Sequence, residues 1–253
     1  MIKLDDIDVV LFDLDGTVYF GSKLISGANE TIEFFRSAHK KIYFTTNNST
    51  KTRFQIYEKL ISMGVSCKLE EILTSGYLAT LYCKKNDLQN VYIFGSSNLI
   101  QEFNDMGISV NQNENAENLL IGYNPLMTYD DLTSALQVAL HAKQIMACNR
   151  ERTFPGENSK IMPGCGAMTA PIEWCVQREC DVIIGKPNTL MIDLLSEKEE
   201  IKADRFIMIG DTFESDIRMA NRAGCKSILI SNNSNYDNTL VVHSIGEIPE
   251  VFQ

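Results

Sequence analysis

The sequence predicts an α/β protein in which a doubly wound parallel sheet carries a second α/β domain as an insertion. Short apolar segments rich in β-branched and aromatic residues recur along the 253 residues, many of them separated by helical patterns. Their apolar residues are consecutive rather than alternating, which is typical of parallel strands covered by helices on both faces. The predicted core strands are Val9–Phe12, Ile42–Thr45, Val182–Ile184, Phe206–Ile209 and Ser227–Ile230.

The interval between the second and third of these strands is too long for a loop, and it contains elements of its own. We therefore predict a core formed by residues 1–85 and 180–253 and an inserted α/β domain at 86–179. The Asn-rich stretch Asn111–Asn118 is interpreted as a solvated loop of the insert, and the spacing of Thr128 and Asp131 resembles a helix capping box. The predicted strands of the insert are Val91–Phe94, Leu119–Gly122 and Ile145–Cys148, and its helices lie near Asn98–Met106, Asp130–Ala142 and Ala167–Gln177.

Composition and charge narrow the class of protein. Hydrophobic residues make up 44% and charged residues 22% of the chain, which is near the globular average, and no apolar run is long enough to span a membrane. The net charge of −10 disfavours nucleic acid and anionic membranes as partners. Three aspartates among the first ten residues argue against an export signal, so we expect a cytoplasmic protein. The seven cysteines include no CxxC pair and are predicted to be reduced and mostly buried.

Two carboxylates follow the first predicted strand directly. Asp13 and Asp15 are two residues apart, so in extended geometry their side chains would point to the same side, about 6.6 Å apart. Open parallel sheets bind ligands at the carboxyl ends of their strands, which makes this pair a candidate site. The alternative is that one aspartate caps the following turn while the other is solvated.

Three further strand ends carry functional groups of a matching kind. Thr46, Asn47 and Asn48 follow the second strand and precede a helix, a combination that suits an anion. Lys186 follows the third strand, and Asp211, with Asp216 beyond it, follows the fourth. Each of these short motifs also occurs in ordinary turns and helix caps. Their shared position at strand ends predicts one crevice lined by carboxylates, an anion cradle and an ammonium group.

In this order the motifs resemble those of the haloacid dehalogenase-like (HAD) phosphatase superfamily. The matching segments are DLDGT, TTNNST, IIGKPN and IGDTFESD. More narrowly, DLDGTVY, TNNST, PGCGAM and IGKPN resemble the branch of NagD-like phosphatases, 4-nitrophenylphosphatases, pyridoxal-phosphate phosphatase and phosphoglycolate phosphatase. The resemblance covers almost the whole chain and implies a Rossmann-like core with an inserted C2-type cap. It is also compatible with a homodimer formed through the cap.

The resemblance also implies a Mg²⁺-dependent phosphomonoesterase. Asp13 would attack phosphorus and form an aspartyl-phosphate, while Asp15 would protonate the leaving group and then activate water. At about 3.5 Å and an effective dielectric constant of about 20, a carboxylate and a phosphate dianion repel each other by about 9 kcal/mol, so a cation is needed. Its implied ligands are the Asp13 and Asp211 carboxylates and the backbone carbonyl of Asp15.

The remaining site residues receive supporting roles from the same resemblance. Thr46, Asn47, Asn48 and Lys186 would bind the phosphoryl oxygens. Asp216 would orient Lys186 or a metal-bound water from behind the ligands; alternatively, it is an acid at a helix N-terminus, favoured by the helix dipole.

Substrate choice is expected to reside in the cap. Phe154 occupies a position where pyridoxal-phosphate-specific relatives carry histidine, which weakens any transfer of that specificity. Its ring would stack on a substrate ring or line an apolar pocket; alternatively, it is a packed aromatic residue of the cap. The expected partner is a small phosphorylated metabolite, such as a sugar phosphate, a nucleotide, phosphoglycolate or pyridoxal phosphate. The alternatives are a phosphotransferase with the same intermediate and a non-catalytic phospho-acceptor that resembles receiver domains.

Overall fold

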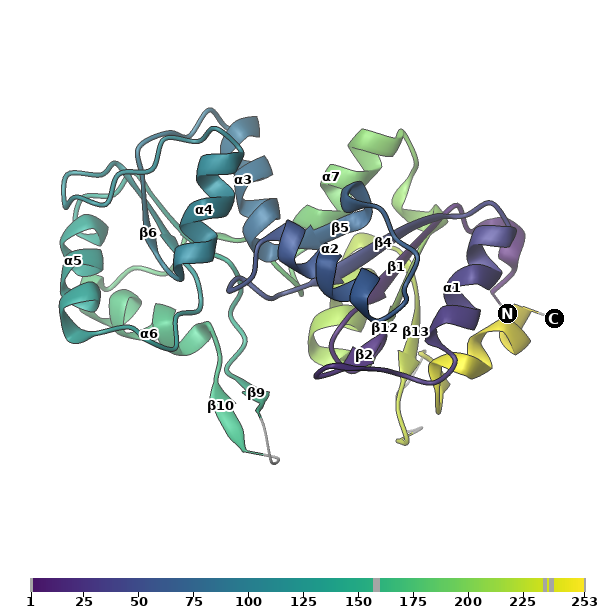
Figure 1. The fold of residues 1–253 in the computed structure, drawn as a ribbon. Helices are drawn as coiled ribbons and strands as arrows, with labels where there is room; N and C mark the ends of the chain where they lie inside the picture. Colours follow the sequence, from purple (N-terminus) through teal and green to yellow (C-terminus); the bar gives the residue numbers. More distant parts are fainter. Residues whose placement is uncertain (1, 157–159, 234–235, 237–238, 253) are drawn as a thin grey trace. The chain divides into compact units, whose positions relative to one another are not determined.

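The chain forms two compact units in the computed structural model, which describes residues 2–156, 160–233, 236 and 239–252 (Figure 1). The first unit comprises Met1–Thr46, Ile56–Leu73 and Lys186–Gln253, and the second comprises Asn47–Gln55 and Thr74–Gly185. These bounds differ from those predicted: residues 47–55, 74–85 and 180–185 group with the inserted unit and not with the core.

A six-stranded sheet forms the centre of the first unit. Its order is β14-β13-β12-β1-β4-β5, and β1 lies between β4 and β12 and runs parallel to both. All five residues of β1 are buried, which explains the unbroken apolar run of its first four residues. The strands are β1 (Val9–Asp13), β4 (Lys41–Thr46), β5 (Ile72–Thr74), β12 (Phe206–Gly210), β13 (Lys226–Ile230) and β14 (Leu240–Val242).

An apolar cluster joins one face of this sheet to the helix that covers it. Phe12 and Phe44 on neighbouring strands pack with Ile32 and Phe35 of α1, and the C-terminal 3-10 helix lies beside α1 (Figure 1). A short hairpin, β2 (Tyr19–Phe20) with β3 (Lys23–Leu24), follows β1. The helices are α1 (Ala28–Ser37), α2 (Arg53–Ser62), α7 (Leu190–Glu199) and α8 (Arg218–Ala223), with 3-10 turns at Leu4–Asp6, Leu69–Glu71, Ala203–Arg205 and Ile245–Phe252 and a π-helical turn at Phe213–Ile217.

The second unit has a parallel sheet of its own, in the order β11-β8-β7-β6. Its apolar core joins residues such as Leu119 and Ile145 of the sheet to Ala135 of α5 and Ile172 of α6. Its elements are β6 (Val91–Phe94), β7 (Asn118–Ile121), β8 (Gln144–Ala147), β11 (Val182–Ile183), α3 (Ser75–Lys85), α4 (Ser97–Asp105), α5 (Tyr129–Ala139), α6 (Gly166–Val176) and the antiparallel hairpin of β9 (Thr153–Pro155) and β10 (Ile161–Pro163).

Two sequence-based expectations about these elements are wrong. The strand predicted at Val182–Ile184 belongs to the second unit, because Val182 of β11 pairs with Met146 of β8. A short apolar run predicts a strand covered by helices but does not indicate which of two parallel sheets receives it. The loop predicted at Asn111–Asn118 ends too late, since Asn118 is buried, begins β7 and donates its amide to Gln89 O at 2.8 Å.

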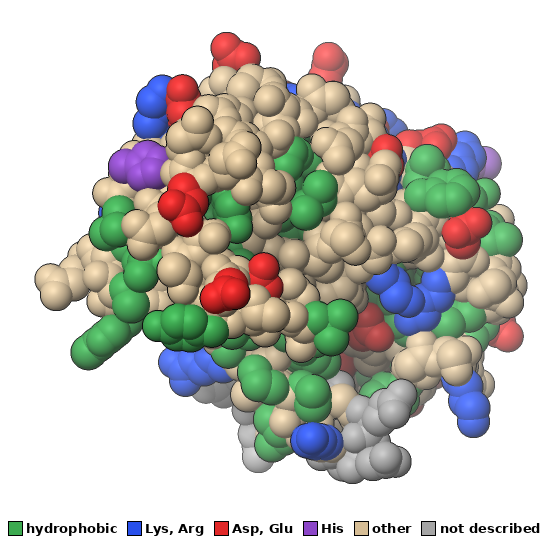
Figure 2. Space-filling model, turned by 60° about the vertical axis from the view of Figure 1, so that its left-hand side comes forward, with side chains coloured by type: hydrophobic (Ala, Val, Ile, Leu, Met, Phe, Trp, Pro, Cys, Tyr) green, Lys and Arg blue, Asp and Glu red, His purple; other side chains and the backbone are tan. Residues whose placement is uncertain are grey.

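The expected helix capping box is confirmed. Thr128 and Asp131 form the predicted capping box, with the Asp131 amide 3.2 Å from Thr128 Oγ1 and the Thr128 amide 2.8 Å from Asp131 Oδ2. None of the seven cysteines is in a disulfide, and five are buried. Among the described residues, no helix combines the length and the apolar character needed to cross a membrane. On the face shown in Figure 2, Lys and Arg side chains occur in small groups among acidic and apolar ones.

Candidate active site

Asp13 stands at the carboxyl end of the central strand of the first unit. It is the last residue of β1, is 7% exposed, and is in register with Thr45 of β4. On the other side of β1, β12 ends at Gly210, and Asp211 follows it. Because these strands are parallel, their carboxyl ends meet at one edge of the sheet, where open α/β folds bind ligands.

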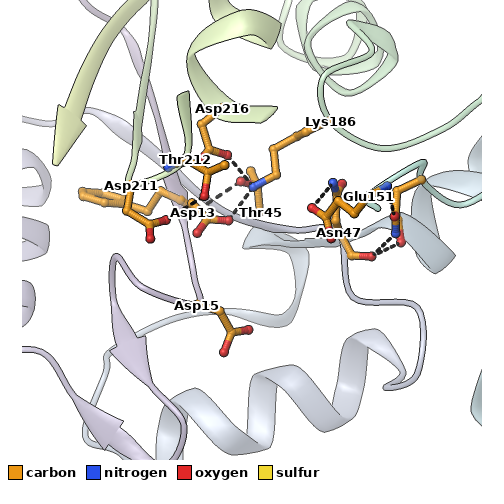
Figure 3. A network of polar contacts seen from close by, with 12 residues as sticks. Asp13, Asp15, Thr45, Asn47, Glu151, Lys186, Asp211, Thr212 and Asp216 are labelled. Atoms are coloured by element: carbon orange, nitrogen blue, oxygen red, sulfur yellow. Dashed lines mark hydrogen bonds and ion pairs between the residues drawn. The ribbon is translucent and has the colours of Figure 1, made fainter. Parts of the chain in front are cut away.

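Lys186 lies between two aspartates in this region (Figure 3). Its Nζ contacts Asp13 Oδ1 in a short ion pair and lies 2.6 Å from Asp216 Oδ1. The lysine is 2% exposed, so burial by itself would lower its pKa; attraction to Asp13 and Asp216 outweighs burial and raises the pKa of Lys186. The ammonium group is therefore a fixed positive charge beside Asp13.

Asp216 is held in place by two donors and by a close backbone approach. Its Oδ1 accepts from Lys186, and its Oδ2 accepts from the Thr212 amide at 3.2 Å. A Cβ at Gly210 would lie 2.3 Å from Asp216 Oδ2, so no larger residue fits at the end of β12. The residue lies in the π-helical turn and is 1% exposed. The helix-dipole interpretation of Asp216 does not account for its ion pair with Lys186.

The carboxylates outnumber the cation in this cluster. Ligand atoms of Asp13, Asp211 and Asp216 all lie within 4.8 Å of one another, and Lys186 forms ion pairs with Asp13 and Asp216. Burial, followed by repulsion from Asp216, raises the pKa of Asp211 to about 6. Burial also raises the pKa of Asp13, and Asp216 and Asp211 add to this against the opposing attraction of Lys186. When all three are ionised, two negative charges stay unbalanced, which a divalent cation would neutralise.

The donor set fits a hard divalent cation, since carboxylate oxygens are the ligands that such ions prefer. Both oxygens of Asp216 already accept hydrogen bonds, so Asp13 and Asp211 are better placed to bind a metal. The turn after β1 also closes over Asp211: Gly16 has a φ of +93°, and a Cβ there would lie 2.2 Å from Asp211 Oδ2. Only glycine fits this turn.

Asp15 is placed differently from the extended arrangement expected for it. The strand ends at Asp13, and the amides of Thr17, Val18 and Tyr19 converge on Leu14 O at 2.9 to 3.3 Å. The chain turns sharply as a result, and Asp15 is exposed and points away from Asp13 (Figure 3). Its Oδ2 accepts a hydrogen bond of 3.1 Å from the Tyr19 hydroxyl. The expectation that both side chains share one side of an extended strand is therefore wrong.

The residues of the predicted anion cradle are divided between the two units. Thr46 is buried and ends β4 in the first unit, whereas Asn47 and Asn48 belong to the second unit. Asn47 donates its amide to Glu151 Oε1 at 2.8 Å. The side-chain oxygen of Asn48 accepts from the amides of Thr50 and Lys51 at 2.9 and 3.0 Å, so it shapes its own turn.

Phe154, the candidate for substrate selection, lies in β9 of the second unit. Its half-buried ring packs edge to face against Tyr123, with ring centroids 5.3 Å apart and an interplanar angle of 83°. This geometry is typical of a stable aromatic pair. The contact with Tyr123 was not predicted.

Sequence reasoning also missed Tyr19 and Glu151. Tyr19 belongs to the hairpin after β1, and only the tight turn at Leu14 brings its hydroxyl back to Asp15. Glu151 lies 104 residues beyond Asn47, so no local pattern could have linked the two.

Comparisons with known proteins agree with the resemblance. The model of the haloacid dehalogenase-like hydrolase family matches residues 10–109, and a second HAD-hydrolase-like model matches residues 183–246. The chain is 33% identical over 227 residues to sugar-phosphatase AraL of Bacillus subtilis, covering 89% of this chain and 83% of that protein. It is 30% identical over 251 residues to phosphoglycolate phosphatase 2 of Arabidopsis thaliana, with the same coverage.

The fold matches a solved structure over nearly its full length. The crystal structure of a 4-nitrophenylphosphatase from Thermotoga maritima superposes with a TM-score of 0.91 at 28% identity, covering 99% of each chain. The agreement includes both units, because neither unit alone accounts for that coverage.

Proposed function

The chain belongs to the haloacid dehalogenase-like hydrolase family and is a phosphoric monoester hydrolase, and we propose that it cleaves small phosphate esters with Mg²⁺ through an aspartyl-phosphate on Asp13. The observation that carries this proposal is the buried cluster at the end of β1, in which Lys186 holds Asp13 and Asp216 and Asp211 lies close by. Such a cluster supplies a nucleophile, a fixed positive charge and oxygen ligands in one place.

Asp13 is the nucleophile in this proposal. Lys186 binds its Oδ1 and so orients the carboxylate for attack on phosphorus by the other oxygen. As the new bond between oxygen and phosphorus forms, the ester bond breaks and the leaving oxygen receives a proton from Asp15. Water then attacks the same phosphorus, Asp15 accepts a proton from it, and the Asp13 carboxylate is released with inorganic phosphate.

Mg²⁺ would be held by the carboxylates of Asp13 and Asp211 and the backbone carbonyl of Asp15. When bound, it supplies positive charge that offsets the repulsion between the carboxylate and the phosphate. Asp216 keeps Lys186 in position, because both of its oxygens are engaged by Lys186 and Thr212. Thr46, Asn47 and Asn48 would contact the phosphoryl oxygens.

The proposed substrates are small phosphorylated metabolites. The relatives are named for a sugar phosphate, phosphoglycolate and 4-nitrophenyl phosphate, which differ in the leaving group and share the phosphoryl group. We assign substrate choice to the second unit, where Phe154 and Tyr123 form an aromatic pair. An apolar ring face there would favour one leaving group over another.

A phosphate-release screen tests the function directly. Sugar phosphates, phosphoglycolate, nucleotides, pyridoxal phosphate and 4-nitrophenyl phosphate are incubated with the full chain and Mg²⁺, and inorganic phosphate is measured. We expect release from at least one metabolite and from 4-nitrophenyl phosphate. Asp211→Asn is the matched variant, and it should need far more Mg²⁺ for the same rate. Absence of release from every ester, or transfer of phosphate to added alcohols in place of water, would overturn the hydrolase proposal.

A further inference from the structure

The hairpin after β1 holds a buried phenol against the carboxylate proposed as the acid. Tyr19 is 1% exposed, and its hydroxyl donates to Asp15 Oδ2 at 3.1 Å. The backbone fixes the same pair, because the Gly16 amide donates to Tyr19 O at 2.8 Å and residues 15 and 19 form a bridge. Because the Tyr19 ring is buried and its backbone is fixed, its hydroxyl points in a single direction. The exposed carboxylate of Asp15 is therefore oriented from the buried side.

Lys59 of α2 lies over the face of the same ring. Its Nζ is 3.4 Å from the centroid of the Tyr19 ring, within the range of a cation–π contact. A positive charge over the ring withdraws electron density from the phenol and makes its O–H a better hydrogen-bond donor. Within the first unit, Lys59 thus contacts the ring of Tyr19, and the hydroxyl of Tyr19 contacts the carboxylate of Asp15.

The hydrogen bond distinguishes the two oxygens of Asp15. Because Oδ2 accepts from Tyr19, a proton on Asp15 would reside on Oδ1, and Oδ1 would be the oxygen that donates to the leaving group. When Asp15 is ionised, Oδ1 is also the oxygen that accepts the proton of the attacking water. One oxygen then serves in both steps, and the carboxylate does not have to rotate between them.

We propose that Tyr19, supported by Lys59, is a positioning residue that fixes the orientation of Asp15 for proton transfer to the leaving group. The inference rests on the proposed function, since it needs Asp15 to act as the acid. Tyr19 itself does not touch the substrate or the reacting atoms, and no proton passes through it. Tyr19 therefore affects kcat/KM only for substrates whose leaving group needs a proton to depart.

Two aryl esters of the same shape test this inference. The 4-nitrophenolate ion departs readily without a proton, whereas unsubstituted phenolate is a poorer leaving group and needs the acid more. The quantity measured is kcat/KM, which covers the steps up to leaving-group departure and excludes the later attack of water. We expect Tyr19→Phe to lower kcat/KM for phenyl phosphate about tenfold and for 4-nitrophenyl phosphate less than about twofold.

Matched variants separate this role from a structural one. Tyr43→Phe removes a similar hydroxyl that contacts Glu199 elsewhere in the same unit, and it should leave the ratio of the two kcat/KM values unchanged. Lys59→Gln leaves Tyr19 in place and should bias the ratio in the same direction by a smaller factor, even if Tyr19→Phe fails to fold. Equal losses on both esters, or no loss on either, would overturn the role of Tyr19.

Asp15→Asn separates the failure of this inference from the failure of the proposed function. This variant should show the strongest bias against phenyl phosphate. If Asp15→Asn shows the bias and Tyr19→Phe and Lys59→Gln do not, the positioning role is wrong and the acid role of Asp15 stands. If Asp15→Asn shows no bias, or the unaltered chain cleaves neither ester, the proposed function itself fails.

Discussion

The two units are built on parallel sheets of the same kind, but the carboxyl ends of their strands differ sharply. In the first unit β1 ends in Asp13 and β12 is followed by Asp211, with Lys186 as the buried cation beside them. In the second unit β6 and β7 are followed by Gly95 and Gly122. The same architecture therefore presents charged groups at one sheet edge and small residues at the other.

An apolar side chain fills the edge of the second sheet. A Cβ at Gly122 would lie 2.5 Å, and one at Gly95 2.9 Å, from Cδ2 of Leu99 in α4. A Cβ at Gly76 would lie 2.9 Å from Leu99 Cδ1. The glycines thus make room for one leucine, which is 2% exposed. A parallel sheet offers a site at its carboxyl edge only where the residues after its strands supply chemistry and leave space for a ligand.

The largest expected effect comes from removing the nucleophile at the charged edge. Asp13→Asn should lower kcat by at least about 10³-fold, because an amide does not attack phosphorus. The shape of the side chain is kept, so folding monitored by circular dichroism should survive. Undiminished Mg²⁺-dependent phosphate release by this variant would contradict the assignment of Asp13.

Removal of the divalent cation should abolish activity at the charged edge of the first sheet and leave the edge of the second sheet unchanged. Treatment with a chelator should reduce phosphate release to the background, and excess Mg²⁺ should restore it. Mg²⁺ at about 100 times its Kd should also raise the free energy of unfolding of the first unit by about 2.7 kcal/mol. Calorimetry with and without Mg²⁺ measures this shift, and Asp211→Asn should abolish it. Turnover that is insensitive to chelation would contradict the metal role.

Lys186 links stability and activity at the charged edge. Lys186→Met leaves Asp13 and Asp216 buried without their cation, which should destabilise the first unit by about 3 kcal/mol in the absence of Mg²⁺. The rate should fall about 10²-fold or more, because the fixed positive charge is lost. The double variant Asp13→Asn/Lys186→Met should regain part of the lost stability in urea denaturation, since it has one unpaired buried charge fewer than Lys186→Met. If the double variant is as unstable as Lys186→Met, the charge argument fails.

Asp13 and Asp211 could be predicted because Asp13 ends one buried strand of the first sheet and Asp211 directly follows another. Their meeting needed only the rule that parallel strands end at one edge of the sheet. The assignment of Val182–Ile184 to the core sheet failed because a short apolar run carries no information about its neighbour in a sheet. In the structure this strand pairs with β8 of the second unit. Lys186 reaches the site because the chain returns to the first unit one residue after Gly185.

Other features depended on tertiary structure that no local pattern encodes. The turn at Leu14 directs Asp15 away from Asp13 and brings Tyr19 to it, whereas extended geometry predicted two parallel side chains. Asn47 looked like part of the core, yet its partners Glu151 and Asn149 lie about a hundred residues away in the second unit. Polar contacts across such separations are set by packing and not by sequence spacing.

The smallest expected effect on catalysis comes from the filled edge of the second sheet. Leu99→Ala opens a cavity over Gly95 and Gly122 and should destabilise the second unit by about 2–5 kcal/mol. Because that edge carries no reacting group, kcat for 4-nitrophenyl phosphate, measured well below the unfolding transition, should change little. Calorimetry and steady-state kinetics on one preparation compare the two effects. A large fall in kcat with little loss of stability would mean that the second sheet edge takes part in catalysis, and the contrast between the two sheets would fail.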